Sequence, residues 1–315
     1  MTPETSGDAM PVPHLMLAVL VVAIWGTNFV VIHFGLMHFH ALTFATLRFA
    51  IASLPFLPFL AWPDARRHLV VLYGLLIGVG QFGLMLFAMQ GHISPGLASV
   101  LIQAQAFFTV VIAVKMSGEK LHRGNIVGLL LCAAGVTMVA LYAGGDADAL
   151  GIALVMGAAL CWGFGNVVAR GIGEVNPLAL VAWSNLFAVP PLAAAALWID
   201  GWAVISESVR TAGPLAWSSA LWQSLGNAMF GYAAWNWLLA RHPASSIAPL
   251  GLLVPFFGLG ASAWILGEGL PAWKIVAALA VVSGLAINIL AQPGRGNRDT
   301  AKASTGDGGI HADLR

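Results

Sequence analysis

Charge is scarce in this sequence. Only 9% of its 315 residues are charged, whereas 59% are hydrophobic, and the mean hydropathy is +0.86. Soluble domains carry about 25% charged residues, so this composition excludes them and indicates a polytopic membrane protein. The net charge of +1 also provides no basic surface for nucleic acid, which excludes a nucleic-acid partner.

Cysteine, early basic residues and enzyme motifs are also rare or missing. Cys132 and Cys161 both lie in apolar runs, so we expect neither a disulfide nor a metal site. No Lys or Arg precedes Arg48; without a basic start the first apolar segment is no cleavable signal peptide. The three histidines within 33–40 are more typical of a solvated loop than of a metal site. Since zincin, nucleophile-elbow and P-loop motifs do not occur, we expect no enzyme activity and no cofactor.

Long apolar runs are the main feature of the sequence. A membrane-spanning helix needs about 20 predominantly apolar residues. Short linkers, such as 91–94 and 121–124, require consecutive helices to lie side by side and antiparallel. The sequence therefore predicts an all-α polytopic membrane protein with ten transmembrane helices. The predicted helices are 14–34, 41–62, 69–90, 95–116, 125–142, 151–170, 178–199, 215–239, 246–266 and 272–290.

Basic residues predict the orientation of these helices. Lys and Arg gather on the cytoplasmic side of a membrane protein, and placing both termini inside puts most of them there. Arg210 and Lys274 fall outside, and Arg48 lies within a span. We expect a tail at 1–13 and a polar, disordered tail at 292–315. The cytoplasmic set is Arg66, Arg67, Lys115, Lys120, Arg123, Arg170, Arg241, Arg295, Arg298, Lys302 and Arg315.

Two sequence motifs recur along the chain. A Phe-Phe pair at 107–108 returns at 256–257, which is 149 residues later. A Trp-Gly pair at 25–26 returns at 162–163, 137 residues later. The longer segment 200–214 accounts for the difference between the two spacings, so the chain reads as a duplication.

The duplication divides the chain into five-helix repeats at 14–142 and 151–291. Because five is odd, the second repeat enters the membrane the other way up. Inverted repeats are an architecture of secondary transporters, so the sequence favours transport. The alternative is a duplicated scaffold with no transport role.

Arg48 is the one charged residue well inside a predicted span. None of the thirteen carboxylates lies in the middle of a span, so a carboxylate proton relay is not expected. Arg48 sits about 10 Å below the external end of its helix at 1.5 Å per residue. A central Arg costs roughly 2.5–3.5 kcal/mol on insertion scales. It either snorkels to the interface or lines a pathway, where it can bind a carboxylate.

Gln103 and Gln105 lie in the middle of the fourth span. They are about 200° apart around a helix, so they face opposite sides. An unpaired amide in hydrocarbon costs several kcal/mol. We expect one of the two to bond to a neighbouring helix and the other to line the pathway, and the sequence leaves open which does which.

Further polar and aromatic residues in the spans complete the predicted pathway. Trp25 shares a helical face with Asn28, and Trp162 shares one with Asn166. The alternatives are interfacial anchoring for the tryptophans and interhelical bonding for the amides. The complete predicted set is Trp25, Asn28, Arg48, Gln81, Gln103, Gln105, Trp162, Asn166, Asn185, Tyr232, Trp235 and Asn236.

Five motifs spread along the chain share the pattern of one known family. They are Trp-Gly-Thr-Asn-Phe-Val-Val-Ile at 25–32, Leu-Arg-Phe at 47–49, the stretch 95–109, Gly-Glu-Lys-Leu-His at 118–122, and Ala-Pro-Leu-Gly-Leu-Leu-Val-Pro at 248–255. They resemble the EamA family of the drug/metabolite transporter superfamily. The resemblance implies ten helices in two inverted repeats, the bacterial inner membrane, and export of small amino-acid metabolites.

The sequence and the resemblance together predict a specific function. We expect a secondary transporter that exports cysteine, O-acetylserine or a similar metabolite across the bacterial inner membrane by alternating access. Arg48 would bind the substrate carboxylate, and carbonyls freed at Pro249 or Pro255 would bind its ammonium group. The alternatives are export of other small molecules, such as drugs or aromatic metabolites, and a membrane-embedded sensor without flux. The driving force and the oligomeric state stay open.

Overall fold

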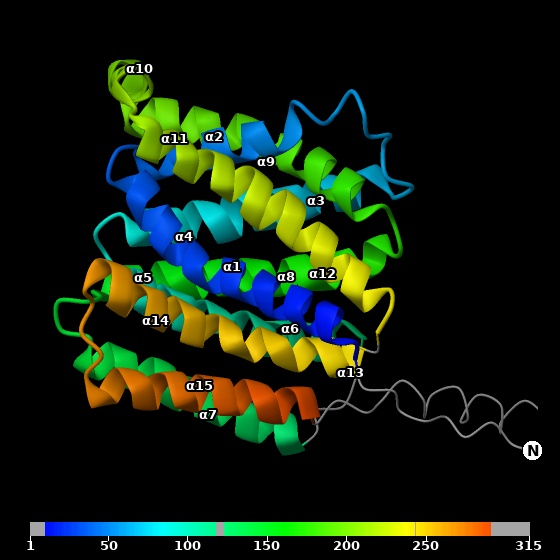
Figure 1. Cartoon of the computed structure of the whole chain (residues 1–315), viewed down its shortest axis with the longest axis vertical. Coiled ribbons are helices and arrows are strands. Elements are labelled where there is room, and N and C mark those ends of the chain that lie inside the picture. Colours follow the sequence, from blue (N-terminus) through cyan, green and yellow to red (C-terminus); the bar gives the residue numbers. More distant parts are fainter. Residues whose placement is uncertain (1–9, 118–122, 243, 291–315) are drawn as a thin grey trace, which may run out of the picture.

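The computed structural model describes residues 10–117, 123–242 and 244–290 (Figure 1). Within these ranges every regular element is a helix, apart from one isolated bridge between Ile93 and Ala147. Both η1 and η3 are π-helices, whereas η2 and η4 are 3₁₀-helices. The helices are α1 (Val12–Leu36), α2 (Ala41–Ser53), α3 (Arg67–Gly74), η1 (Leu75–Gly83), α4 (Leu84–Met89), α5 (Pro95–Leu101), η2 (Ile102–Ala104), α6 (Gln105–Ser117), α7 (Arg123–Tyr142), α8 (Ala149–Ile172), α9 (Pro177–Ile199), α10 (Gly201–Thr211), α11 (Pro214–Leu221), η3 (Trp222–Phe230), α12 (Gly231–Leu239), α13 (Ala244–Ile247), η4 (Ala248–Leu253), α14 (Val254–Leu266) and α15 (Ala272–Leu290).

Eight helical segments of the described residues are long and apolar enough to cross a membrane. The helix from α11 through α12 is continuous over 214–239, but its amide and hydroxyl side chains lower its hydropathy. The expected span 41–62 was too long, since α2 ends at Ser53. Pro55 and Pro58 follow directly, and proline removes a helix hydrogen bond and restricts the residue before it. The expected tail 292–315 lies outside the described residues.

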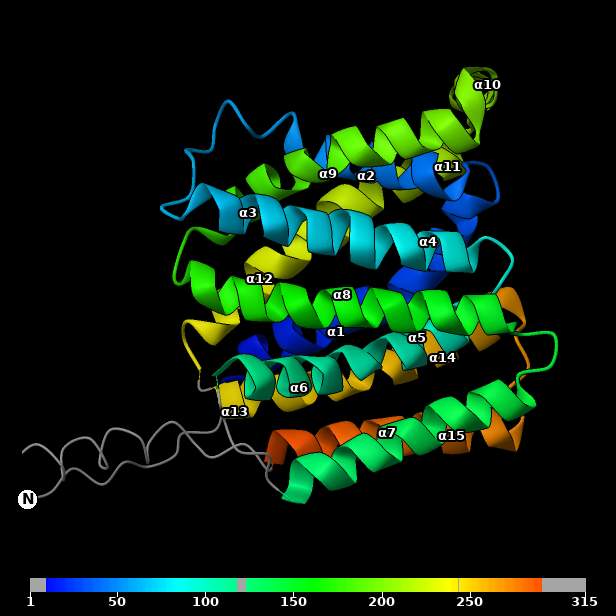
Figure 2. The same ribbon diagram turned by 180° about the vertical axis from the view of Figure 1, so that it is seen from behind.

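Apart from α10, which is seen nearly end-on, the helices run close to parallel or antiparallel with one another, as both views show (Figure 1, Figure 2). The helices α7 and α15 lie side by side at one edge of the stack, and α10 lies at the opposite edge. Linkers 37–40, 90–94, 143–148 and 267–271 share one end of the bundle (Figure 1). Successive helices therefore alternate in direction, as the short linkers required.

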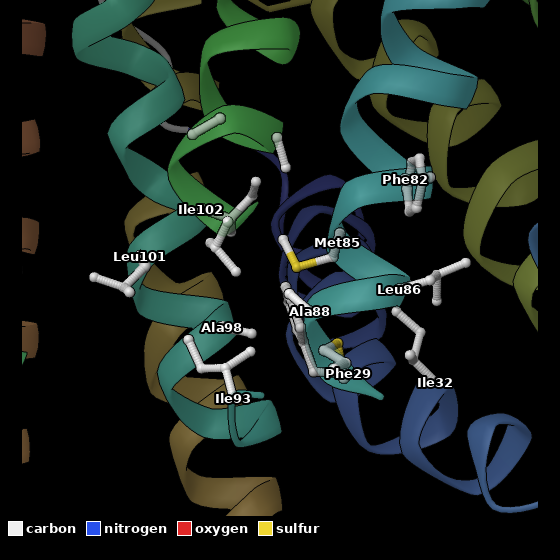
Figure 3. Close-up of a cluster of buried hydrophobic side chains, with 14 of the residues drawn as sticks. Phe29, Ile32, Phe82, Met85, Leu86, Ala88, Ile93, Ala98, Leu101 and Ile102 are labelled. Carbon is white, nitrogen blue, oxygen red and sulfur yellow. The ribbon is translucent and has the colours of Figure 1, made fainter. Parts of the chain in front are cut away.

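Buried apolar side chains pack where α1 crosses η1, α4 and α5. Phe29 and Ile32 of α1 lie against residues of η1 and α4, and α5 closes the other side (Figure 3). This contact fixes α1 in the middle of the bundle. The labelled members of the cluster are Phe29, Ile32, Phe82, Met85, Leu86, Ala88, Ile93, Ala98, Leu101 and Ile102 (Figure 3).

An ionic network ties the linkers together at the end that carries 143–148. The ammonium group of Lys274 is fully buried and lies 3.0 Å from Asp146 Oδ2 and 3.5 Å from Glu268 Oε2. The backbone N–H of Gly96 donates to Glu268 Oε1 at 3.2 Å. Glu268 thus anchors the start of α5 to the start of α15, and its place between two helices agrees with the expectation that no carboxylate lies in the middle of a span.

The first turn of α8 is fixed at the same end. Asp148 accepts from the backbone N–H of Gly151 at 2.7 Å and caps the helix. Its other oxygen lies 2.7 Å from Nδ1 of His92, in the 90–94 linker. This hydrogen bond, more than the cap, lowers the pKa of the Asp148 carboxyl.

Glycine allows α7 and α15 to pack backbone to backbone. A Cβ placed at Gly284 would lie 2.6 Å from the carbonyl oxygen of Gly128, and one at Gly135 would lie 2.9 Å from that of Ala277. Small residues at such contacts let helix backbones approach closely in membranes. Close backbone packing, rather than attraction between charges, therefore holds the two helices together.

We expect Gly284→Ala to destabilise the protein, because the new methyl group would force α15 away from Gly128 at a cost of about 1–3 kcal/mol. The measurement is the melting temperature in detergent. Gly260→Ala is the matched control, since a Cβ at Gly260 of α14 meets nothing within 4 Å and alanine favours helix. Equal melting temperatures for the two variants would contradict the packing described here.

Candidate functional site

A small internal cavity lies between α2, α3, α9 and α12 and the two π-helical segments η1 and η3. Its volume is about 10 Å³ for the centre of a water molecule, which is room for about one water. A larger molecule can enter only if the surrounding helices separate. The lining residues are Arg48, Phe49, Tyr73, Ile77, Phe82, Val181, Ser184, Asn185, Ala228 and Tyr232.

Arg48 places a positive charge in the wall of this cavity. The side chain is only 2% exposed, so it does not snorkel to the interface; it points into the bundle. Its guanidinium carbon lies 3.4 Å from the ring centroid of Phe82 and 4.8 Å from that of Phe49. Rings at this distance attract a cation through their quadrupole, by about 2 kcal/mol where water is excluded.

The polar contacts of Arg48 are incomplete. Its Nε donates to the carbonyl oxygen of Gln223 at 3.5 Å, but its Nη1 is buried without a hydrogen-bond partner among the described residues. None of the ion pairs in that part of the chain includes Arg48. A buried donor without a partner costs about 1–3 kcal/mol, and more when it is charged. An acceptor that entered the cavity would therefore gain a strong hydrogen bond.

Close helix packing brings the other walls of the cavity together. Any side chain at Gly74 would overlap the carbonyl group of Ser184, and one at Gly78 would overlap Ala188. The segment α3–η1 can thus lie directly on α9. Tyr73 and Ile77 of this segment therefore line the same cavity as Ser184 and Asn185 of α9.

The π-helical turns sit at the level of the cavity. The segment η1 contributes Phe82 and η3 contributes Ala228. Such turns are rare and are frequently found at functional sites. Wide turns displace the side chains by one position relative to an α-helix, and hydropathy does not reveal them.

Gln223 connects three helices beneath Arg48. Its Nε2 donates to Asn28 Oδ1 of α1 at 2.6 Å, while its carbonyl oxygen accepts from Arg48. The neighbouring Ser224 donates to the carbonyl oxygen of Arg48 at 2.9 Å. The segment η3 therefore positions α2 and α1 together, and Asn28 acts in this support rather than in the cavity wall.

An aromatic group adjoins the cavity at Tyr232. The ring of Trp25 lies 5.7 Å from Tyr232 and 5.1 Å from Trp235, between centroids. Its Nε1 donates to the carbonyl oxygen of Asn227 at 3.4 Å. Trp25 and Trp235 thus pack against each other between α1 and α12.

Of the two glutamines, Gln105 is the one that bonds to a neighbouring helix. Asn166 Nδ2 donates to Gln105 Oε1 at 2.8 Å and lies 3.0 Å from Thr109 Oγ1. This bond joins α6 to α8. Gln103 is buried at 6% exposure on the other side of the segment and does not line the cavity.

Three further predicted residues also lie outside the cavity wall. Trp162 is partly buried against the main core. Asn236 donates to the carbonyl oxygen of Tyr232, one turn earlier in its own helix, at 2.8 Å. Gln81 is 4% exposed, and its Oε1 is buried without a partner among the described residues. Its free oxygen makes Gln81 a second incomplete polar group near Phe82.

The structure thus brings together three of the twelve predicted residues, Arg48, Asn185 and Tyr232. The prediction missed Gln223 and Tyr73. Gln223 carried the same signal as Gln81, an amide inside an apolar span, and Tyr73 is one of only three tyrosines.

The prolines of the ninth span do not supply a second wall. Pro249 begins a 3₁₀ segment and Pro255 lies in the first turn of α14. Neither residue lines the cavity. The structure packs α14 on α1 and α5, so the expectation that their freed carbonyls bind the ammonium group stays a prediction without support from this cavity.

The chain matches known transporters along most of its length. The model of the EamA-like transporter family matches twice, at residues 13–141 and 149–290. A protein of Salmonella typhimurium named "Probable amino-acid metabolite efflux pump" is 36% identical over 279 residues, covering 87% of this chain and 93% of the relative. The protein of the same name in Escherichia coli is 35% identical, covering 87% and 94%.

More distant matches include another exporter and a protein of similar fold. A "Probable terminal-alkyne amino-acid exporter" of Streptantibioticus cattleyicolor is 27% identical, covering 85% of this chain and 90% of the relative. A crystal structure of another protein superposes with a TM-score of 0.58 at 18% identity, covering 89% of this chain and 97% of the other. That last similarity concerns the fold alone.

We expect the bond between Asn28 and Gln223 to stabilise the bundle by about 0.6–1.7 kcal/mol, the range for interhelical hydrogen bonds in membranes. The measurement is a double-mutant cycle of Asn28→Ala and Gln223→Ala, with unfolding followed in mixed micelles. In the control cycle Asn28→Ala is combined with Asn236→Ala, whose amide bonds within its own helix, so the effects should add. Additivity in both cycles would contradict the bond.

Proposed function

Because the chain belongs to the EamA-like transporter family, we propose that it exports small amino-acid metabolites across the bacterial inner membrane. Cysteine and O-acetylserine are the proposed substrates. Two relatives at 35% and 36% identity are named as amino-acid metabolite efflux pumps. The observation that carries the proposal is the buried guanidinium of Arg48, whose Nη1 has no partner among the described residues.

The proposed role of Arg48 is to bind the carboxylate that all amino acids share. Hydrogen bonds between guanidinium and carboxylate are charge-assisted and roughly twice as strong as neutral ones. The substrate amine would meet neutral oxygens at the cavity wall, on Ser184, Asn185 and Tyr232. Substrates with several positive charges would find no carboxylate there to pair with.

Transport requires the cavity to open, because it has room for about one water only. We propose alternating access, in which helices α2, α3, α9 and α12 separate toward one side at a time. The backbone contacts at Gly74 and Gly78 suit a sliding movement. The close packing of α7 on α15 suits a fixed frame.

The proposed architecture is ten transmembrane helices in two inverted repeats, at 14–142 and 151–291. Its support is that the family model matches once in each half. A Cβ at Gly26 of α1 would overlap Phe257, and one at Gly163 of α8 would meet Phe108. The repeated Trp-Gly pairs thus pack on the repeated Phe-Phe pairs of the opposite half, as an in-plane pseudo-twofold requires.

The proposed orientation has both termini in the cytoplasm. The bundle end formed by 54–66, 173–176 and 240–242 is rich in Arg and Lys, as the positive-inside rule requires. The opposite end carries Arg210 and the buried Lys274. The described basic residues at the first end are Arg66, Arg67, Lys115, Arg123, Arg170 and Arg241.

Export of aromatic metabolites is a second candidate. The cavity wall includes four aromatic rings, those of Phe49, Tyr73, Phe82 and Tyr232. Such rings stack on flat cargo at about 0.5–1.5 kcal/mol beyond area burial. Direct flux measurement with tryptophan beside O-acetylserine separates the two candidates and also excludes a sensor without flux.

We expect Arg48→Gln to raise the KM for O-acetylserine or cysteine about tenfold or more, since a hydrogen bond to a charged group is worth about 1.5–3 kcal/mol. The measurement is flux in proteoliposomes. Arg210→Gln is the matched control, because it removes the same charge from an exposed residue of α10 that pairs with Glu207. An unchanged KM in a stably inserted Arg48→Gln protein would refute the site.

We expect a cysteine at Gly145 to react with an impermeant thiol reagent on intact cells, and a cysteine at Asp64 to stay unlabelled. The two residues lie in linkers at opposite ends of the bundle. Cys132→Ala and Cys161→Ala remove the native thiols first. The reverse labelling pattern would overturn the orientation.

A further inference from the structure

The cavity holds one cation and no anion. Arg48 is the only ionised residue among those that line it. Every described carboxylate lies in a linker or in α10, and none of them is among the residues that line the cavity. The site therefore carries an uncompensated positive charge when it is empty.

A net charge buried in a dry site favours a ligand of the opposite net charge. A monoanion neutralises Arg48, whereas a zwitterion leaves the site at a net charge of +1 and brings an ammonium group with no anion to receive it. Burying a charge without a partner is costly, and neutral acceptors compensate for it only in part.

The aromatic rings of the cavity wall do not remove this difference between a monoanion and a zwitterion. The face of Phe82 is already occupied by the guanidinium of Arg48, at 3.4 Å. Ser184 and Asn185 of α9 offer neutral polar groups in the same cavity wall, and these can bond equally to an amide. An acylated amine can therefore bond to the same polar groups without bringing a positive charge into the cavity.

Building on the proposed carboxylate role of Arg48, we propose that the site also exports monocarboxylates without a free ammonium group, and binds them more tightly than zwitterions. N-acylated amino acids are the chemical class that fits best. Their carboxylate bonds to Arg48, their amide bonds to Asn185 or Ser184, and a small acyl group packs against the rings of Tyr73 and Tyr232.

The test uses two isomers, N-acetyl-L-serine and O-acetyl-L-serine, which differ in whether the amine is free. The full-length protein is placed in proteoliposomes at about pH 6, where the free amine stays protonated and the acetyl group does not migrate to it. Each unlabelled isomer competes with labelled O-acetyl-L-serine, and efflux of labelled N-acetyl-L-serine is measured separately. N-acetyl-L-serinamide, which has no charge, should not compete.

We expect N-acetyl-L-serine to compete at about tenfold lower concentration than its isomer and to leave the vesicles faster than from protein-free liposomes. An equal or higher half-inhibitory concentration, or competition without efflux, would overturn the inference. If O-acetyl-L-serine moves and N-acetyl-L-serine does not, the inference fails alone. If neither moves, the proposed function fails with it.

Asn185→Asp provides a second variant of almost unchanged size. It adds a carboxylate to the cavity that Arg48 lines and should reverse the preference, so that O-acetyl-L-serine competes at the lower concentration. Asn236→Asp is the matched control, because Asn236 bonds within its own helix and does not line the cavity. A preference that Asn185→Asp leaves unchanged would show that charge balance does not select the substrate.

Discussion

The guanidinium of Arg48 packs on the ring of Phe82 inside an apolar bundle, and the neighbouring helices are built to keep it there. The segment η1 supplies the ring, and η3 supplies the carbonyl of Gln223 and the hydroxyl of Ser224. In lipid no water could replace these contacts. The helix α2 is therefore fixed to η3 through the same residue that faces the cavity, so the binding that we propose at Arg48 would act directly on the packing of α2.

Hydropathy and residue type could predict the parts of the structure that follow from the cost of burial. The apolar runs predicted the helices, and the charge or amide at depth drew attention to Arg48 and Asn185, which the structure places in the wall of one cavity. The reason is that an isolated polar group in a span needs a partner or a wet space. The resemblance to the EamA family, carried by motifs such as 25–32, was confirmed by the match over both halves of the chain.

The other contacts of the site depend on how each helix is rotated about its own axis, which could not be predicted from the sequence. Gln105 and Gln103 have the same chemistry, and only the packing of α6 on α8 decides that Gln105 bonds to Asn166. The π-helical turns shift Phe82 into the cavity wall, and a regular 3.6-residue period does not foresee that. For the same reason Pro249 and Pro255 were assigned to a site that they do not line.

In the repeat that we propose, only one of the two halves contributes a charge to the site. Arg48 and Asn185 are separated by 137 residues, the same spacing as the two Trp-Gly pairs, so they occupy equivalent positions in α2 and α9. Both line the cavity. A pseudo-twofold site made of two arginines would repel itself, and one made of two amides would lack a carboxylate receptor. With one charge from the first half and one neutral amide from the second, the cavity can orient a substrate by its carboxylate while the two halves still move as equivalent units.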